Sequence, residues 1–271
     1  MGTSKSSTGP GANVPMVPPW AETIGPSTPD GAAQQPLFDA DVPTLTPATA
    51  PARRFGAARR NFSSFARSGN SVDMRRGLSH YVSTGYGGSR TFTRRMGGTA
   101  TTGGRLGMLL ATGQTVEGIS LRDRALAGGS DTNIIMDAIV SAVRPEDGTQ
   151  DAEGSRRSIR EALSDLLERF PDADLLRLDD AQRSFVIERY AALDVYQRFF
   201  LDMGKGVIAA AADTASGLGR LREIREFIAE SVAASFRRIR GDKGTATSAN
   251  IGVLTQHALA QTFSIFEEYL G

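Results

Sequence analysis

The sequence predicts an all-α protein, a helical bundle preceded by a long disordered tail rich in Pro, Gly and Ser and by an arginine-rich helical segment. Ten of the 12 prolines fall between Pro10 and Pro51. Apolar residues recur at helical spacing through most of the chain after Pro51, and no stretch shows the alternation typical of a strand. We therefore divide the chain into a disordered tail (1–51), a basic helical and Gly-rich segment (52–105) and an α-helical domain (106–271).

The tail mixes its prolines with Gly, Ser, Thr and Ala. Such a composition buries too little apolar surface to offset the entropy of ordering, which favours disorder or local polyproline II. Its one large apolar feature contains the only tryptophan of the chain and consists of Val17, Pro18, Pro19 and Trp20. A proline pair followed by an indole suits a docking anchor for a partner, because proline restricts the backbone and the indole offers a large contact area. A stray aromatic in a linker is the alternative.

The basic segment 52–105 has eleven arginines, no lysine and a single acid, Asp73, for a net charge of +10. Apolar residues spaced between arginines predict a short basic amphipathic helix within 52–69 and a second within 72–85. Residues 86–107 have too many glycines to stay regular throughout, although 90–96 could add a turn or two of helix.

Nine of these arginines are candidate contacts to a nucleic acid or to an acidic partner: Arg53, Arg54, Arg59, Arg60, Arg67, Arg75, Arg76, Arg94 and Arg95. Six aromatic residues lie between them, Phe55, Phe62, Phe65, Tyr81, Tyr86 and Phe92, and could stack on bases while the arginines follow the backbone. An acidic protein partner explains the pattern equally well, and a solvated basic face is a third interpretation. The exclusive use of arginine favours planar, bidentate contacts or reflects a GC-rich genome.

From Leu106 onward the pattern is helical. Ser158 and Glu161 have the spacing of a capping box and predict a helix that ends before Pro171. Asp179 and Asp180 can cap the next helix, which runs until Gly204. Two more are predicted, from near Ser216 to Gly241 and over 251–269. These helices predict a bundle of four or more over 106–271.

The chain is poorly equipped for catalysis. It has no cysteine and only two histidines, His80 and His257, which excludes thiolate chemistry and leaves no conventional metal centre. Neither a phosphate-binding P-loop nor a nucleophile elbow is present. We expect no catalytic residue, no bound metal and no enzymatic activity. No apolar run approaches the roughly 20 residues of a membrane span, and no secretory signal is evident, so we expect a cytoplasmic protein without membrane contact.

Gly2 is the most promising reactive group. Met1 precedes a residue small enough for the methionine to be removed, which leaves a glycine amine at the end of a flexible arm. An α-amine titrates near pH 8, about two units below lysine, so about a tenth of it is neutral and nucleophilic at pH 7. The start also fits the N-myristoylation pattern, which is weak and needs a eukaryotic transferase, whereas the Ala, Arg and Gly bias is typical of bacteria.

Four stretches carry a family resemblance: MGTSKSSTGPGANVPMVPPWA, RRNFSSFARSG, LSHYVSTGYGG and TRRMGG. Together they resemble the QatB family of the bacterial Qat anti-phage defence system. The resemblance covers the first hundred residues well and agrees with the length of the helical remainder. It implies a non-enzymatic component that acts beside a KAP-type ATPase (QatA), a QueC-like 7-deazaguanine synthase (QatC) and a TatD-like nuclease (QatD).

The resemblance also implies a role for the N-terminus. A QueC-like enzyme activates the carboxylate of 7-carboxy-7-deazaguanine as an adenylate, which ammonia normally attacks. In the protein-modifying branch the α-amine of a partner's N-terminal glycine replaces ammonia, so Gly2 would receive a covalent 7-amido-7-deazaguanine, the one cofactor-like group expected. Thr3 and Ser4 would thread the active site, and Val17, Pro18, Pro19 and Trp20 would bind QatC. A nucleic-acid-binding or scaffolding module that uses residues 52–105 is the alternative.

Overall fold

The computed structural model describes residues 14–17, 49–115, 118, 120–123, 131–243 and 251–269. Within these ranges the chain is helical and contains no strand, only the isolated bridges Pro15 to Thr49 and Gln114 to Ser120. The prediction of an all-α protein is confirmed. Most of the predicted disordered tail lies outside the described residues. None of the helices in these ranges combines the length and apolarity needed to cross a bilayer.

The arginine-rich segment forms helices, as predicted. Helix α1 (Gly56–Ser68) ends at Gly69, whose left-handed backbone (φ 71°) donates to the carbonyl of Phe65. Helix α2 (Ser71–His80) begins after Asn70, whose side chain accepts from the amide of Val72. A π-helical turn, η1 (Tyr81–Gly85), and helix α3 (Ser89–Arg95) come next along the chain.

The expectation that glycines would interrupt residues 86–107 is confirmed at Gly87 and Gly88, which precede α3, but is wrong for the stretch after Met96. Helix α4 (Gly97–Thr112) is continuous because Gly103, Gly104 and Gly107 face helix α11 (Ile251–Glu268) at close range. A Cβ on Gly104 would lie 3.2 Å from the Cα of Gly252, and one on Gly107 would collide with Ile251. Contact between the two helices thus compensates the low helix propensity of glycine.

Helix α6 (Thr132–Val143) leads into α7 (Gln150–Arg169), which begins earlier than predicted. Thr149 is the N-cap and accepts a 3.1 Å hydrogen bond from the amide of Ala152. Ser158 lies inside the helix, where its Oγ donates to the carbonyl of Gly154 at 3.0 Å. The predicted capping box of Ser158 and Glu161 is therefore wrong, because the helix already begins two turns upstream, after Thr149.

Helix α8 (Asp180–Phe199) begins with a capping box formed by Asp179 and Gln182, which confirms Asp179 as a cap. The predicted stop at Gly204 is wrong, because the helical path continues through a second π-helical turn, η2 (Phe200–Gly204), into α9 (Lys205–Ala210). Helices α10 (Thr214–Lys243) and α11 agree with the two last predicted helices.

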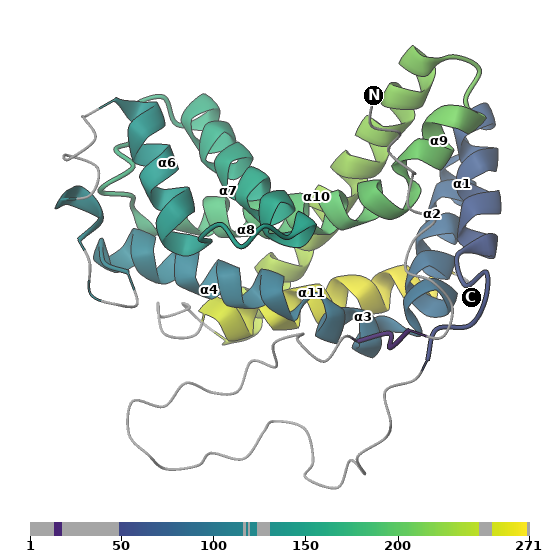
Figure 1. The fold of residues 1–271 in the computed structure, drawn as a ribbon, viewed down its shortest axis with the longest axis horizontal. Helices are drawn as coiled ribbons and strands as arrows, with labels where there is room; N and C mark the ends of the chain where they lie inside the picture. The colour runs from purple at the N-terminus through teal and green to yellow at the C-terminus, as the bar shows by residue number, and fades with distance from the viewer. Residues whose placement is uncertain are drawn as a thin grey trace, which may run out of the picture.

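Two hydrophobic clusters form the core. The first combines α1, α2, η1 and α3 with the second half of α8, η2, α9, α10 and α11. The second combines α4, α6 and α7 with inward residues of α8 such as Val186 and Leu193. Figure 1 shows α6 and α7 on one side of the molecule, α1, α2 and α9 on the other, and α4 and α11 running along one edge of both groups. Helix α8 therefore joins the two clusters, and the basic segment shares one of them with the helical domain.

Candidate functional site

The predicted recognition residues of the arm are mostly beyond what the structure describes. Gly2, Thr3, Ser4, Pro18, Pro19 and Trp20 lie outside the described residues, whereas Val17 is half-buried. It belongs to residues 14–17, here called the N-terminal clip. The carbonyl of Val14 accepts a 2.9 Å hydrogen bond from the amide of Ala50, and Pro15 forms an antiparallel bridge with Thr49.

The clip is attached to the helical domain by Met16, whose side chain is only 7% exposed. Met16 packs on Gly87, where an added Cβ would lie 2.8 Å from the methionine Sδ. Gly87 also has a φ of 75°, which residues with a side chain rarely adopt. In Figure 1 the clip is the short purple segment beside α3. The arm thus joins the domain at the turn that precedes α3.

The nine candidate arginines differ in exposure. Six are exposed: Arg53, Arg60, Arg67, Arg75, Arg76 and Arg94. None of these six forms an ion pair with an acid of the described ranges. Arg54 is buried, with its guanidinium 4.8 Å from the ring centre of Phe55 and 5.5 Å from that of Tyr86. Arg59 and Arg95 are half-buried.

The six aromatic residues of the basic segment cannot stack on bases. Phe55, Phe62, Phe65, Tyr81, Tyr86 and Phe92 are each at most 3% exposed and form part of the first hydrophobic cluster. Phe92, for example, stacks on Tyr86 with ring centres 4.1 Å apart. The predicted stacking role is wrong because helix formation turns these rings inward, where they bury more apolar surface than a nucleic acid could cover.

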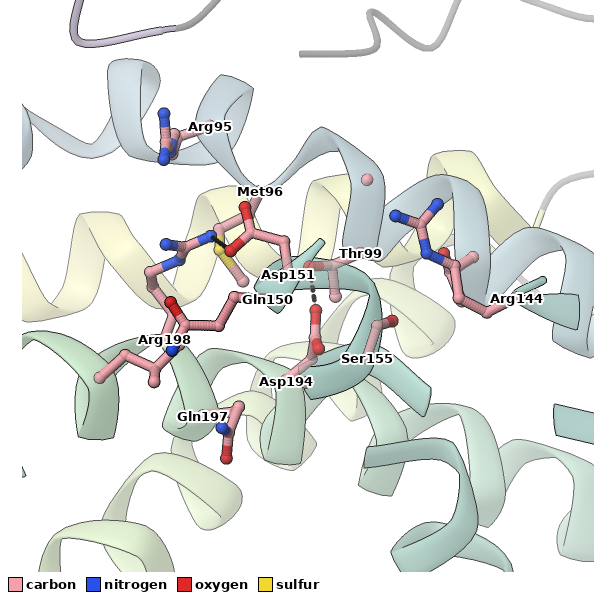
Figure 2. A pocket seen from close by; sticks show the side chains of 14 residues that line it. Arg95, Met96, Thr99, Arg144, Gln150, Asp151, Ser155, Asp194, Gln197 and Arg198 are labelled. Atoms are coloured by element: carbon pink, nitrogen blue, oxygen red, sulfur yellow. Dashed lines mark hydrogen bonds and ion pairs between the residues drawn. The ribbon is translucent and has the colours of Figure 1, made fainter. Parts of the chain in front are cut away.

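A polar pocket opens where the basic segment meets α7 and α8. Its volume is about 110 Å³, and it is lined by the α3–α4 junction, the first turns of α7, the end of α8 with Leu201, and Arg144 after α6. Its polar side chains are those of Arg95, Thr99, Thr102, Arg144, Gln150, Asp151, Ser155, Asp194, Gln197 and Arg198. Figure 2 shows Arg95 and Arg198 at one end, with Thr99, Asp194 and Ser155 farther along.

Two carboxylates in the pocket have defined partners (Figure 2). Thr99 Oγ1 donates to Asp194 Oδ2 at 2.5 Å, and Arg198 Nη2 lies 2.6 Å from Asp151 Oδ1. Asp194 Oδ1 accepts no hydrogen bond from the residues that the structure describes. Each of the two carboxylates, both of which line the pocket, thus keeps one oxygen that can accept a further hydrogen bond.

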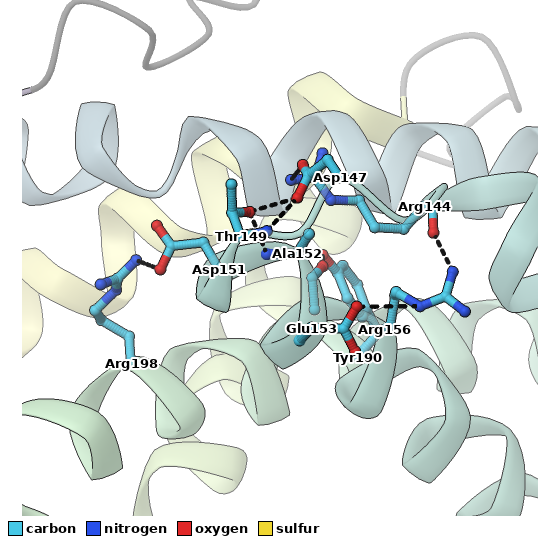
Figure 3. Close-up of polar contacts among 10 residues, drawn as sticks. Arg144, Asp147, Thr149, Asp151, Ala152, Glu153, Arg156, Tyr190 and Arg198 are labelled. Carbon is cyan, nitrogen blue, oxygen red and sulfur yellow. Dashed lines mark hydrogen bonds and ion pairs between the residues drawn. The ribbon is translucent and has the colours of Figure 1, made fainter. Parts of the chain in front are cut away.

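The turn between α6 and α7 holds one wall of the pocket in place. Asp147 Oδ1 accepts from the amide of Thr149 at 2.8 Å and from its hydroxyl at 2.6 Å. Arg156 Nη1 donates to the carbonyl of Arg144 at 2.7 Å. Figure 3 shows these contacts beside the Asp151 to Arg198 ion pair. These contacts therefore hold the N-terminus of α7 in position at the wall of the pocket.

Burial perturbs the charged groups of the pocket. Desolvation raises the pKa of Asp194 to about 6, although the hydrogen bond from Thr99 and the charge of Arg198 oppose the shift. Burial, followed by the proximity of Arg198, lowers the pKa of Arg95. The guanidinium groups of Arg95 and Arg198 are therefore close enough to repel each other.

Beneath the pocket, Asp202 of η2 connects the two π-helical turns. Its Oδ2 accepts a hydrogen bond of 2.8 Å from Tyr81 of η1 and one of 2.5 Å from Tyr86. Burial raises the pKa of Tyr86, which therefore remains a neutral donor. These bonds fix the end of α8, which carries Arg198, against the arginine-rich segment.

Sequence reasoning missed this pocket. Arg95 was predicted as one of several contacts to a nucleic acid or acidic partner, and Thr99, Asp151 and Asp194 were not singled out. The lining residues come from four separate parts of the chain, so no local motif exists. Asp194 and Arg198 lie four residues apart on one helix, but α8 also carries Asp180, Arg183, Glu188 and Arg189, so this spacing gives no distinctive signal. Within the described ranges, no group of three or more His, Asp or Glu side chains could hold a metal ion.

The fold and site define a helical protein with a docked N-terminal clip, an arginine-rich surface and a charged pocket. The model of the family described as Qat anti-phage system associated protein QatB matches residues 87–266, well over half of the chain. The chain therefore belongs to the QatB family and is a component of a Qat anti-phage defence system. Comparisons with curated proteins and with solved structures gave no significant match. All pocket-lining residues lie inside the matched range, and the arm lies outside it.

Proposed function

We propose that this subunit is the protein substrate of a QueC-like partner, QatC, which joins a 7-deazaguanine to its N-terminal glycine. The adenylated carboxylate of 7-carboxy-7-deazaguanine is attacked by the neutral α-amine of Gly2. The new C–N bond forms as the bond between the acyl carbon and AMP breaks, and the amine loses a proton to solvent or to a base of the partner. The subunit supplies the nucleophile, and the partner supplies the catalysis.

The observation that supports this proposal is the attachment of the arm at the clip. Met16 is buried against the turn at Gly87, so the segment that carries Gly2 has a defined starting point on the folded domain. The twelve residue-to-residue steps from Gly2 to Val14 span at most about 40 Å when extended. A partner that modifies Gly2 must therefore bind within that distance of α3, and Trp20, three residues after the clip, is a candidate contact for it.

Intact mass spectrometry after co-expression with the QueC-like partner and its precursor pathway tests the proposal. We expect one adduct per chain, located by fragmentation on Gly2. Replacement of Lys5, the only lysine in the tail, by Arg should leave the adduct unchanged, because the α-amine is the nucleophile. An unmodified glycine terminus, or an adduct that persists after deletion of Gly2, would contradict the proposal.

A second candidate function is contact with a nucleic acid through the exposed arginines. The favouring observation is that six of them form no ion pair with described acids, which leaves their charge available to phosphates. Replacing Arg60 and Arg67 of α1 by Gln should weaken binding and reduce its salt dependence. The same change at exposed Arg222 of α10 is the control. Binding that does not respond to salt would exclude this function.

A further inference from the structure

Three guanidinium groups line the pocket, and they come from different parts of the fold. Arg95 ends α3, Arg198 lies near the end of α8, and Arg144 comes directly after α6. The Nε of Arg144 is buried and makes no hydrogen bond to the described residues. Gln150 and Asp151, at the positive N-terminal end of α7, line the same pocket. Arg198 pairs with Asp151, and Arg144 Nη2 lies 3.2 Å from Asp147 Oδ2. The lining itself has three arginines against two aspartates, a net charge of +1 that favours an anionic ligand.

The pocket has room for a small anion. Its volume of about 110 Å³ admits a tetrahedral oxyanion. Arg198 already pairs with Asp151 through Nη2, yet a guanidinium has five donors and can hold a second acceptor. Arginine forks match the oxygens of phosphate in geometry as well as in charge.

Asp194 further limits which anion can bind in the pocket. Its Oδ2 accepts from Thr99, and its Oδ1 is an unoccupied acceptor among the described residues. A carboxylate repels a fully ionised oxyanion but accepts a hydrogen bond from one that retains a proton. Hydrogenphosphate retains a proton near neutral pH, whereas sulfate does not.

We propose that the pocket binds inorganic phosphate as hydrogenphosphate, with Arg95 and Arg198 holding its charged oxygens and Asp194 accepting a hydrogen bond from its hydroxyl group. The site goes beyond the proposed modification of Gly2 and does not depend on it. Deletion of Gly2 should leave phosphate binding unchanged, so the two proposals can fail separately.

Isothermal titration calorimetry and thermal unfolding of the full chain test the site near neutral pH and at constant ionic strength. The three probes are inorganic phosphate, sulfate and glycerol phosphate. We expect phosphate to bind and to raise Tm, and the other two to bind at least about tenfold more weakly. Glycerol phosphate should be weak because a phosphate monoester, with a second pKa of about 6, has largely lost its proton.

Two pairs of variants locate the binding. Arg95→Gln should weaken phosphate binding at least about tenfold, whereas Arg94→Gln, an exposed neighbour with the same charge change, should not. Gly98 lines the pocket, and a Cβ there would meet no atom within 4 Å. Gly98→Phe should therefore block the pocket without disturbing the helix, and Gly98→Ala should leave it open. Circular dichroism verifies that each variant is folded. If Arg95→Gln does not fold, the comparison of Gly98→Phe with Gly98→Ala decides whether phosphate binds in the pocket.

Asp194→Asn tests selectivity, because an amide can donate to any oxyanion and should abolish the preference for phosphate over sulfate. Equal responses of the wild-type chain to phosphate and sulfate would overturn the proposal, since both salts stabilise proteins non-specifically. Stronger binding of glycerol phosphate than of phosphate would also overturn it. So would phosphate binding that survives Gly98→Phe.

Discussion

At the scale of single residues, the surroundings of Asp194 favour its neutral form. Desolvation raises its pKa to about 6, so the folded protein binds a proton there at a pH where the unfolded chain has released it. The wild-type free energy of unfolding should therefore decrease as the pH rises from about 4 to about 6 and be independent of this group above that range. The other charged groups that line the pocket are Arg95, Arg144, Asp151 and Arg198.

The variant Asp194→Asn tests this dependence of stability on the ionisation of Asp194. The variant cannot ionise and retains an acceptor for Thr99 Oγ1. It should be more stable than wild type at about pH 7.5, and its advantage should shrink by about 1 kcal/mol at about pH 5. Urea unfolding at both pH values measures the difference. An advantage that stays constant or grows as the pH falls would show that the carboxyl is not desolvated.

At the scale of elements, the glycines of α4 illustrate what periodicity predicts and what it misses. Glycine lowers helix propensity, so the stretch after Met96 was expected to be irregular. The structure shows a continuous helix because Gly104 and Gly107 let α4 approach α11 closely. Helices with clear apolar periodicity, such as α8, α10 and α11, were predicted well. The start of α7 was misplaced because Thr149 is followed by polar residues, which give no periodic signal.

Two glycine substitutions should have opposite effects on stability. Gly104→Ala places a methyl group 3.2 Å from the backbone of Gly252, which cannot move aside easily, and should cost about 1–2 kcal/mol. Gly219→Ala, inside α10 with no atom within 4 Å of the new Cβ, should add about 0.5–1 kcal/mol through helix propensity. Chemical denaturation measures both. If Gly104→Ala were also stabilising, the close contact between α4 and α11 would be refuted.

At the scale of the whole molecule, the clip separates the arm from the folded domain. Contacts of the described N-terminal residues with the domain begin at Val14 and are dominated by the buried side chain of Met16. The first hydrophobic cluster lies on one side of α8 and the second on the other, and the charged pocket opens near the end of this shared helix.

Truncation should show where the arm ends. Removal of residues 1–13 should leave Tm unchanged, because the described contacts with the domain are retained. Removal of residues 1–17 should lower Tm by about 2–4 °C through loss of the buried methionine. Met16→Ala in the full chain should produce a similar decrease. Differential scanning calorimetry measures all three, and identical Tm values for the two truncations would argue against docking of the clip.

The sequence by itself determined the helical class, most helix positions and the concentration of arginine in residues 52–105. These depend on local properties, namely periodicity and composition. Tertiary structure alone decided that the six aromatics are buried, that Met16 attaches the arm and that Arg95, Asp194 and Arg198 line one pocket. The physical reason is that burial and charge proximity depend on which distant segments pack together, and apolar periodicity specifies an inward face without specifying its partner.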